Sequence, residues 1–291
     1  MTPLDYEFLR RLLKERSGLD LSSDKQYLVE SRLIPLARRV GLPGLAELVA
    51  KMKAGSDALT TEVVEAMTTN ETFFFRDKIP FDHLREIMPE LLQARANRRC
   101  LRIWCAASSS GQEPYSIAMC LKQIAPALTG WRVEILATDL SQEVLEKSRA
   151  GIYSQFEVQR GLPIQLLVQH FTQVGELWQL NADIRAMVQH RKLNLLHDFS
   201  HLGMFDVIFC RNVLIYFDQD TKLGIFDRLA RVLEPDGVLA LGAAESVVGI
   251  TDVFKPYPER RGLYRPNAAR AVRGGVMALM PHASMAVASA R

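Results

Sequence analysis

The stretch LRIWCAASSSGQEPYSIAMCLKQIA, residues 101–125, decides the fold of this chain. Its first seven residues are apolar except for Arg102 and predict a buried strand, its small polar centre predicts a loop, and its apolar second half predicts a helix. Further apolar runs of strand length occur at 133–139, 205–212 and 238–245. The first two of these runs are followed by helical segments. Strands that alternate with helices predict an α/β fold whose parallel sheet is covered on both faces.

Ligands of such sheets bind at the carboxyl ends of the strands, near the point where the strand order switches. This rule selects three segments of the chain as candidate binding loops, namely 107–113, 139–141 and 211–216.

The residues before this pattern are predicted to form a helical domain over 1–80, since they contain no strand-like run. Leu4, Phe8, Leu9, Leu12 and Leu13 share one apolar helix face, which ends at Gly18. The remaining helices are expected at about 25–40, capped by Ser22-Ser23-Asp24, then at 45–53 and 57–69, and finally between Pro80 and Pro89.

The α/β domain is predicted over 81–265, with a small inserted antiparallel β subdomain at about 151–195. Within this insertion, ELWQLNADIRAMVQHRKL (176–193) alternates like two antiparallel strands that are joined by a turn at 181–183. The turn EPDG precedes the strand at 238. The segment 266–291 is rich in Ala, Gly and Ser, and we expect it to be a disordered tail.

Composition excludes several classes of protein. Of the 291 residues, 48% are hydrophobic and 24% charged, which is typical of a globular chain. A net charge of +3 is too small to indicate a nucleic-acid partner. No apolar run reaches the ~18 residues that a membrane helix needs, and we expect the first residues not to form a secretory signal. Because the four Cys and six His have no disulfide or metal-ligand spacing, we expect a cytoplasmic protein without a metal.

The loop after the first strand argues against a dinucleotide. It holds only one glycine, Gly111, so the GxGxxG fingerprint is absent. Glu113 begins the next helix, where a carboxylate would repel a phosphate but would suit a cationic or amine-bearing ligand. Its alternative role is to complement the positive end of that helix.

Asp139 ends the second strand, and an acid at that position commonly accepts the hydroxyls of a ribose. It could instead cap the following helix, although Ser141 could fill that role equally well. A sugar, an amine and no phosphate are the combination of groups that S-adenosylmethionine presents. The pair Glu113 and Asp139 therefore predicts S-adenosylmethionine as the cofactor.

Two further segments place polar residues near the predicted cleft. In NETFFFR (70–76), the three Phe favour a hydrophobic hinge that packs the helical domain against the sheet, whereas Asn70 and Arg76 favour ligand contact. In CRNVLIYF (210–217), Arg211 and Asn212 follow an apolar run at the mouth of the cleft. Cys105 and Cys210 are expected to be small core residues and not nucleophiles.

Together these motifs resemble the CheR chemotaxis methyltransferases, which methylate glutamates of bacterial chemoreceptors. The resemblance covers about residues 1–265 and includes NETFFFR, WCAASSSGQEPYSIAM (104–119), ATDLS (137–141), NLLHDF (194–199) and FDVIFCRNVLIYFD (205–218). It implies a Rossmann-like methyltransferase domain with a helical N-terminal domain and an inserted β subdomain. It also implies a cofactor site built from Asn70, Thr72, Arg76, Glu113, Asp139, Asn194, Leu195, Arg211 and Asn212.

The resemblance implies transfer of a methyl group to an acceptor glutamate, which is already ionised at neutral pH and needs no general base. Arg76 would then position cofactor or substrate. The chain departs from the family at Ser108 and Gln112, where Cys and Glu are frequent. Some members bind a receptor pentapeptide at a glycine-rich turn of the β subdomain. Because FTQVGELWQL holds only Gly175, we predict no tight pentapeptide tether.

The partner implied is the cytoplasmic helical domain of chemoreceptors. Lys25, Arg32, Arg38 and Arg39 lie on one predicted helix and could attract its glutamates, or could simply form a solvated face. Three other functions compete with this one. A nucleic-acid methyltransferase lacks support from charge and from an Asn-Pro-Pro-aromatic motif, and the loop disfavours a nicotinamide dehydrogenase. A sensor that binds S-adenosylmethionine without catalysis stays open.

Overall fold

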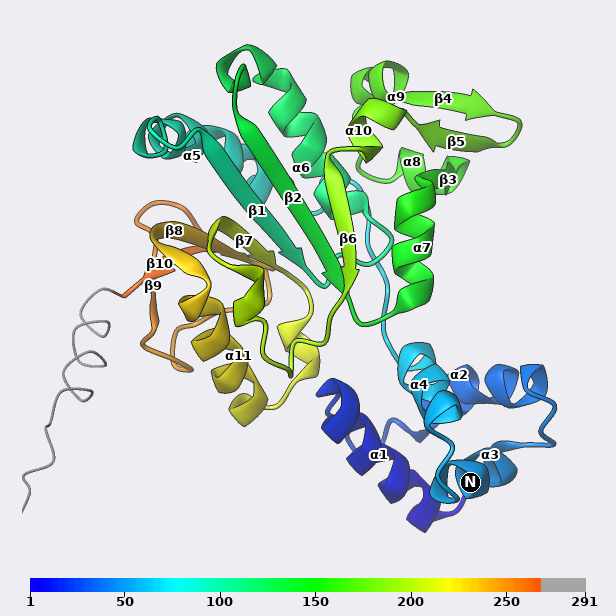
Figure 1. Cartoon of the computed structure of the whole chain (residues 1–291). Helices are drawn as coiled ribbons and strands as arrows, with labels where there is room; N and C mark the ends of the chain where they lie inside the picture. Colours follow the sequence, from blue (N-terminus) through cyan, green and yellow to red (C-terminus); the bar gives the residue numbers. More distant parts are fainter. Residues whose placement is uncertain (268–291) are drawn as a thin grey trace, which may run out of the picture.

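The computed structural model describes residues 1–267, so nearly all of the tail predicted at 266–291 lies outside the described residues. Figure 1 shows a group of N-terminal helices, a large twisted sheet and a small second sheet. The N-terminal helices are α1 (Pro3–Ser17), α2 (Gln26–Arg39), α3 (Leu45–Lys53) and α4 (Asp57–Ala66). Among the described residues, no helix is both long and apolar enough to cross a membrane.

The large sheet has seven strands in the order β6-β2-β1-β7-β8-β10-β9. Its strands are β1 (Cys100–Ala106), β2 (Arg132–Asp139), β6 (Val188–Lys192), β7 (Phe205–Cys210), β8 (Leu233–Leu241), β9 (Phe254–Pro256) and β10 (Leu263–Pro266). The first five are parallel, whereas β10 pairs antiparallel with both β8 and β9. The predicted α/β fold is thus confirmed, with an antiparallel edge that the sequence did not indicate.

Alternation along β1 explains why both faces of the sheet are covered. Leu101, Ile103 and Cys105 point into one core together with the apolar residues of α5 (Ile79–Ala94) and α6 (Gln112–Gln123). Trp104 and Ala106 point into a second core, which α11 (Gln219–Arg231) covers. Successive strand residues face opposite sides, so a strand between two helical layers is apolar throughout.

Local chemistry explains several helix ends. Thr2 caps α1, and Gly18 ends it in the left-handed conformation with φ 77°. Asp218 caps α11, and Ser141 caps α7 (Gln142–Ala150). The expected cap of α2 is wrong, because that helix begins after Lys25 with no side-chain cap bond.

Two other boundaries that were predicted at prolines differ from expectation. Pro89 lies inside α5 on its exposed side and does not end it. The residues EPDG belong to β8, at a register shift opposite Phe205 and Val207, and do not form a separate turn.

The insertion contains a three-stranded antiparallel sheet in the order β3-β5-β4, with β3 (Ile152–Ser154), β4 (Phe171–Val174) and β5 (Leu177–Leu180). Short helices α8 (Gln155–Gln159), α9 (Ile164–His170) and α10 (Ala182–Arg185) accompany it. The hairpin predicted over 176–193 is wrong. Residues 182–185 are helical, and β6 joins the large sheet parallel to β2. Alternation of apolar and polar residues shows that a strand is buried on one side, but it does not show which strand is its partner.

The N-terminal helices have their own core and meet the carboxyl edge of the large sheet, as Figure 1 shows. Asn194 Nδ2 donates to the carbonyl of Arg16 at 2.7 Å, and Lys14 pairs with Asp218. A Cβ on Gly18 would lie 2.9 Å from the ring of Phe217, so this contact needs a glycine.

The aromatic segment 73–75 does not pack the helical domain against the sheet, contrary to expectation. Phe74 is fully buried against Tyr153 and Phe171 of the insertion. Phe75 packs on Phe81 of α5. Both residues therefore belong to the core beneath the large sheet and not to the helical core.

Candidate cofactor and active site

A pocket of about 990 Å³, part of it open to solvent, lies at the carboxyl edge of the sheet. The loops after β1, β2, β6 and β7 line it, together with the segment 67–72 that connects α4 to the sheet. Every residue of the predicted site lies in its wall: Asn70, Thr72, Arg76, Glu113, Asp139, Asn194, Leu195, Arg211 and Asn212.

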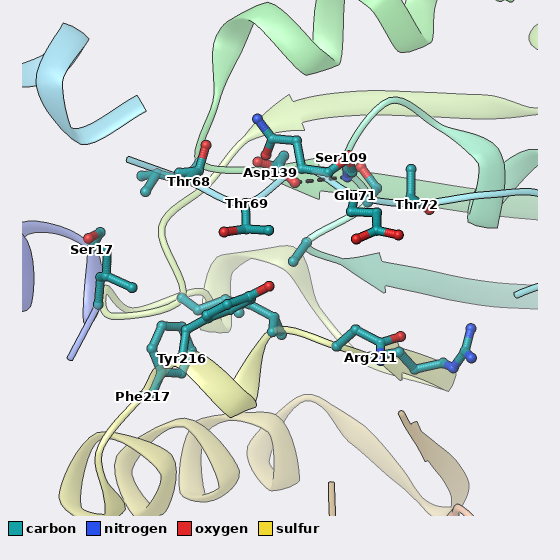
Figure 2. Close-up of a pocket in the computed structure, with 18 of the residues that line it drawn as sticks. Ser17, Thr68, Thr69, Glu71, Thr72, Ser109, Asp139, Arg211, Tyr216 and Phe217 are labelled. Carbon is teal, nitrogen blue, oxygen red and sulfur yellow. Dashed lines mark hydrogen bonds between the residues drawn. The ribbon is translucent and has the colours of Figure 1, made fainter. Parts of the chain in front are cut away.

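Asp139 ends β2 and holds two loops together (Figure 2). One carboxylate oxygen accepts the backbone N–H of Ser109 at 2.8 Å, and the other accepts that of Ser141 at 3.0 Å. Burial raises the pKa of this carboxyl, while the backbone hydrogen bonds oppose that rise. Because Ser141 caps α7, Asp139 is free of that role and still faces the pocket.

Glu113 lies in the first turn of α6, where it can complement the positive end of the helix, and it also lies in the pocket wall, where it can contact a ligand. One of its oxygens accepts Arg211 Nη1 at 2.7 Å, a pair that the sequence did not indicate. Burial raises the pKa of Glu113, and the neighbouring guanidinium of Arg211 counteracts this effect. The pair brings two opposite charges together in the buried wall of the pocket.

Arg211 bonds mainly to other groups of the protein and is hardly exposed to the pocket or to solvent. Its side chain is 1% exposed, and Nη2 donates to the carbonyl of Arg76 at 2.9 Å and to Asp77 at 2.7 Å. It therefore links the end of β7 to the α6 turn and to the segment that carries Arg76. Arg76 is half-buried, donates to the carbonyl of Glu71 at 2.8 Å and lies over the ring of Phe73.

Glu245 is an organising residue that sequence reasoning missed. It is buried, and its two oxygens accept the backbone N–H groups of Asn212, Val213, Leu214 and Gly242 at 2.7–2.9 Å. Asn212 has φ 58°, a strained conformation that these hydrogen bonds to Glu245 stabilise. The available signal was an acid at the end of the fourth apolar run.

Other lining residues were not predicted individually, although six of them lie in the candidate loops 107–113, 139–141 and 211–216. They are Ser17, Leu19, Met67, Thr68, Thr69, Glu71, Ala107, Ser108, Ser109, Leu140, Leu193, Val213, Tyr216 and Phe217. Several come from the helical domain and its connection, whose approach to the sheet no local pattern reveals. Figure 2 shows Thr68, Thr69 and Tyr216 among the side chains around the pocket.

The residues present fit S-adenosylmethionine. The pocket offers two buried carboxylates and apolar walls, and Ser108 Oγ is buried there without a hydrogen-bond partner. Gly111 does not serve a phosphate, because a Cβ at this position would lie 2.1 Å from Ser148 Oγ in α7. In the described part of the chain, no group of three or more His, Cys, Asp or Glu could hold a metal ion.

A sheet with its pocket at the switch between β1 and β7, a loop with one glycine and an acid at the end of β2 define a methyltransferase that depends on S-adenosylmethionine. Two family models match the chain. "CheR methyltransferase, all-alpha domain" matches residues 4–68, and "CheR methyltransferase, SAM binding domain" matches residues 70–263. The chain belongs to the CheR methyltransferase family.

Curated relatives agree with this assignment. The chain is 43% identical to chemotaxis protein methyltransferase 1 of Pseudomonas aeruginosa over 256 residues, which are 86% of this chain and 93% of the relative. It is 42% identical to chemotaxis protein methyltransferase 1 of Vibrio cholerae, over 86% of this chain and 92% of the relative. It is 36% identical to the chemotaxis protein methyltransferase of Borreliella burgdorferi, over 83% of this chain and 88% of the relative.

Proposed function

We propose that this protein transfers the methyl group of S-adenosylmethionine to glutamate side-chain carboxylates of chemoreceptors, giving glutamate methyl esters and S-adenosylhomocysteine. The observation that carries this proposal is the pocket between Asp139 and Glu113 in a chain that belongs to the CheR family. The relatives' names, chemotaxis protein methyltransferases, support the chemoreceptor as substrate.

Each predicted site residue has a role in this proposal. Asp139 accepts the ribose hydroxyls, and the carboxylate of Glu113 attracts the amino group, for which its pairing with Arg211 leaves one oxygen. Asn70, Thr72, Asn194, Leu195 and Asn212 complete the cofactor walls. Arg211 acts through Glu113, so it is a positioning residue.

S-adenosylmethionine supplies an electrophilic methyl group on a sulfonium. An acceptor glutamate of pKa ~4.3 is ionised at neutral pH, so no protein side chain has to remove a proton. Arg76 is the group that orients the acceptor carboxylate or the cofactor. Alignment of two reactants can supply about 7–11 kcal/mol of the barrier, which is the main contribution this site has to make.

The acceptor lies in the cytoplasmic helical domain of the receptors, and the enzyme works in the cytoplasm without inserting into the membrane. Arg38 on α2 is exposed, and Arg39 is exposed although it pairs with Glu62. These side chains can attract glutamate-rich segments, and such attraction weakens with salt. Arg32, which was expected on the same helix, instead donates to the carbonyls of Met67 and Thr68.

We further predict that methylation needs no tight pentapeptide tether. The turn between β4 and β5 is only Gly175-Glu176, since Val174 pairs with Leu177. Such a turn offers little backbone to a peptide. Calorimetry with a receptor C-terminal pentapeptide should detect no binding at micromolar concentrations, and micromolar affinity would contradict this prediction.

The function is tested by incubating the protein with receptor-containing membranes and S-adenosylmethionine labelled in the methyl group. We expect label in the receptor band that is released as methanol by mild base, because carboxyl methyl esters are base-labile. Label that resists base would indicate a nitrogen acceptor. Cofactor binding without any transfer would indicate a sensor and would refute the enzymatic proposal.

A further inference from the structure

The partly buried side chain of Arg32 in α2 bonds to a segment that lines the cofactor pocket. Its Nη1 donates to the carbonyl of Met67 at 2.5 Å and to that of Thr68 at 3.0 Å, and its Nη2 donates to Thr69 Oγ1 at 2.9 Å. The three acceptors are consecutive, and all three residues line the pocket. One guanidinium of the helical domain thus holds a complete stretch of pocket wall.

The charge of Arg32 is balanced by carbonyl oxygens. Among residues 1–267 it forms no ion pair with a carboxylate, and burial lowers its pKa. The carbonyls that it contacts follow the end of α4, where the helix dipole is negative and favours a cation. Hydrogen bonds from a charged donor are stronger than neutral ones, so three of them at one partly buried side chain fix the wall effectively.

The same stretch is fixed from the sheet side. Glu65 accepts Lys192 Nζ at 2.6 Å and the backbone N–H of Gln142 at 3.2 Å. The carbonyl of Asn70 accepts Ser109 Oγ at 2.8 Å, next to Asp139. Residues 66–69 therefore bridge two anchored ends, and Arg32 is the side chain that holds the middle.

We propose that Arg32 is a positioning residue for the cofactor, through which the helical domain sets the affinity of the pocket for S-adenosylmethionine. The proposal rests on the proposed function only for the identity of the ligand. It assigns Arg32 a role different from that of the exposed Arg38, six residues later on the same helix, whose side chain has no hydrogen-bond partner in the described part of the chain.

The test compares Arg32→Gln, Arg32→Lys and Arg38→Gln in the full-length protein, with calorimetry of S-adenosylhomocysteine binding and steady-state methylation of receptor membranes. We expect Arg32→Gln to weaken S-adenosylhomocysteine about 10-fold or more and to raise KM for S-adenosylmethionine, with KM for receptor unchanged. Arg32→Lys retains the charge but loses the planar set of guanidinium donors, so we expect a loss of S-adenosylhomocysteine affinity between those of wild type and Arg32→Gln. Arg38→Gln has the same change in charge and should bind S-adenosylhomocysteine within about twofold of wild type.

A double-mutant cycle guards against a general loss of fold. Thr69→Val removes one acceptor of Arg32, and we expect its effect on S-adenosylhomocysteine affinity to be smaller in the Arg32→Lys background than in wild type. Additive effects would overturn the proposal. So would unchanged S-adenosylhomocysteine affinity in Arg32→Gln with a raised KM for receptor, which would make Arg32 a receptor contact. Failure of wild type to bind S-adenosylhomocysteine would overturn the proposed function as well.

Discussion

At the residue scale, the site is organised by acids that hold backbone N–H groups. Asp139 accepts two such groups and Glu245 accepts four, and both carboxylates are buried. Each acid lies at or beyond the carboxyl end of a strand, so the sheet sets its position. Loops whose N–H groups are satisfied in this way keep their shape before a ligand arrives, which reduces the cost of binding.

Asp139→Asn should weaken S-adenosylhomocysteine binding about 100-fold or more. An amide cannot accept from both Ser109 and Ser141 and also offer the charge that strengthens bonds to ribose hydroxyls. Isothermal titration calorimetry measures the change. Asp198→Asn, an exposed acid bonded to Ser200, is the matched control and should bind as wild type does. Near-normal affinity in Asp139→Asn would remove the assignment of this residue.

Cys210→Ser should leave kcat within about twofold of wild type. The thiol is fully buried, and burial raises its pKa well above the usual value, so it is no nucleophile at neutral pH. An unpartnered hydroxyl there costs about 1–3 kcal/mol, which thermal denaturation should detect. A protein that stays folded and loses turnover more than 10-fold would show that Cys210 takes part in the chemistry.

At the element scale, the loop between β1 and α6 depends on Gly111. This residue has φ 95°, and the hydroxyl of Ser148 occupies the place of its missing side chain. The hydroxyl of Tyr153, in the insertion, donates to the carbonyl of Ser110 at 2.9 Å. The insertion and α7 thereby support the loop that carries Ser108 and Ser109 into the pocket.

Gly111→Ala should lower the free energy of unfolding by about 2–4 kcal/mol, since it adds a strained conformation to a steric conflict in a packed region. Gly175→Ala is the matched control, because Gly175 also has positive φ but nothing lies within 4 Å of its Cβ position. Gly175→Ala should therefore lower the free energy of unfolding only by the conformational cost of about 1 kcal/mol. Equal losses in urea denaturation of the two variants would contradict the steric argument.

The elements that could be predicted are those whose sequence signal is independent of their partners. The strands β1, β2, β7 and β8 are buried on both faces, and each of them therefore has an apolar run that can be recognised in its own sequence. The strand β6 has a mixed pattern, so its place beside β2 depends on long-range pairing that alternation cannot report. Likewise β9 and β10 have only three and four residues, too few for a period to emerge.

The site could be predicted in part for a similar reason. Asp139 and Glu113 follow strand ends, where topology alone selects residues. The pairing of Glu113 with Arg211, however, joins residues 98 positions apart, and Arg32 reaches the carbonyls of Met67 and Thr68, which lie 35 and 36 positions further along the chain. The roles of the nine predicted residues and the division into 1–80 and 81–265 stay predictions.

At the scale of the whole molecule, the pocket is shared between the helical N-terminal domain and the sheet. The backbone N–H of Asp20 donates to the carbonyl of Tyr216 at 2.9 Å, and Asn194 reaches the end of α1. The walls of the pocket therefore come from both domains. Cofactor binding should stabilise the entire described structure and not only the α/β part.

Acid should destabilise the fold from about pH 6.5 downward. Burial lowers the pKa of His190 to about 4, and it lowers that of His170 as well. The unfolded chain takes up these protons near pH 6.5 while the folded chain resists until lower pH, so stability is present above pH 6.5 and is lost as pH falls toward 4. His190 contacts Ser148 Oγ at 2.7 Å, behind Gly111.

Thermal denaturation at pH 7 and pH 5 checks this prediction, with His190→Gln as the reference. Glutamine can still bond to Ser148 but does not titrate, so the variant should lose less Tm between the two pH values than wild type. Identical losses would show that His190 does not carry the acid sensitivity. The raised pKa of Asp139 acts in the opposite direction and is common to both proteins.

The most direct measurement is a crystal structure of the full-length protein with S-adenosylhomocysteine. The account predicts the ribose hydroxyls at Asp139 and the amino group at Glu113, in the pocket between the loops after β1 and β2. A nucleoside bound elsewhere, or a ribose turned away from Asp139, would contradict it.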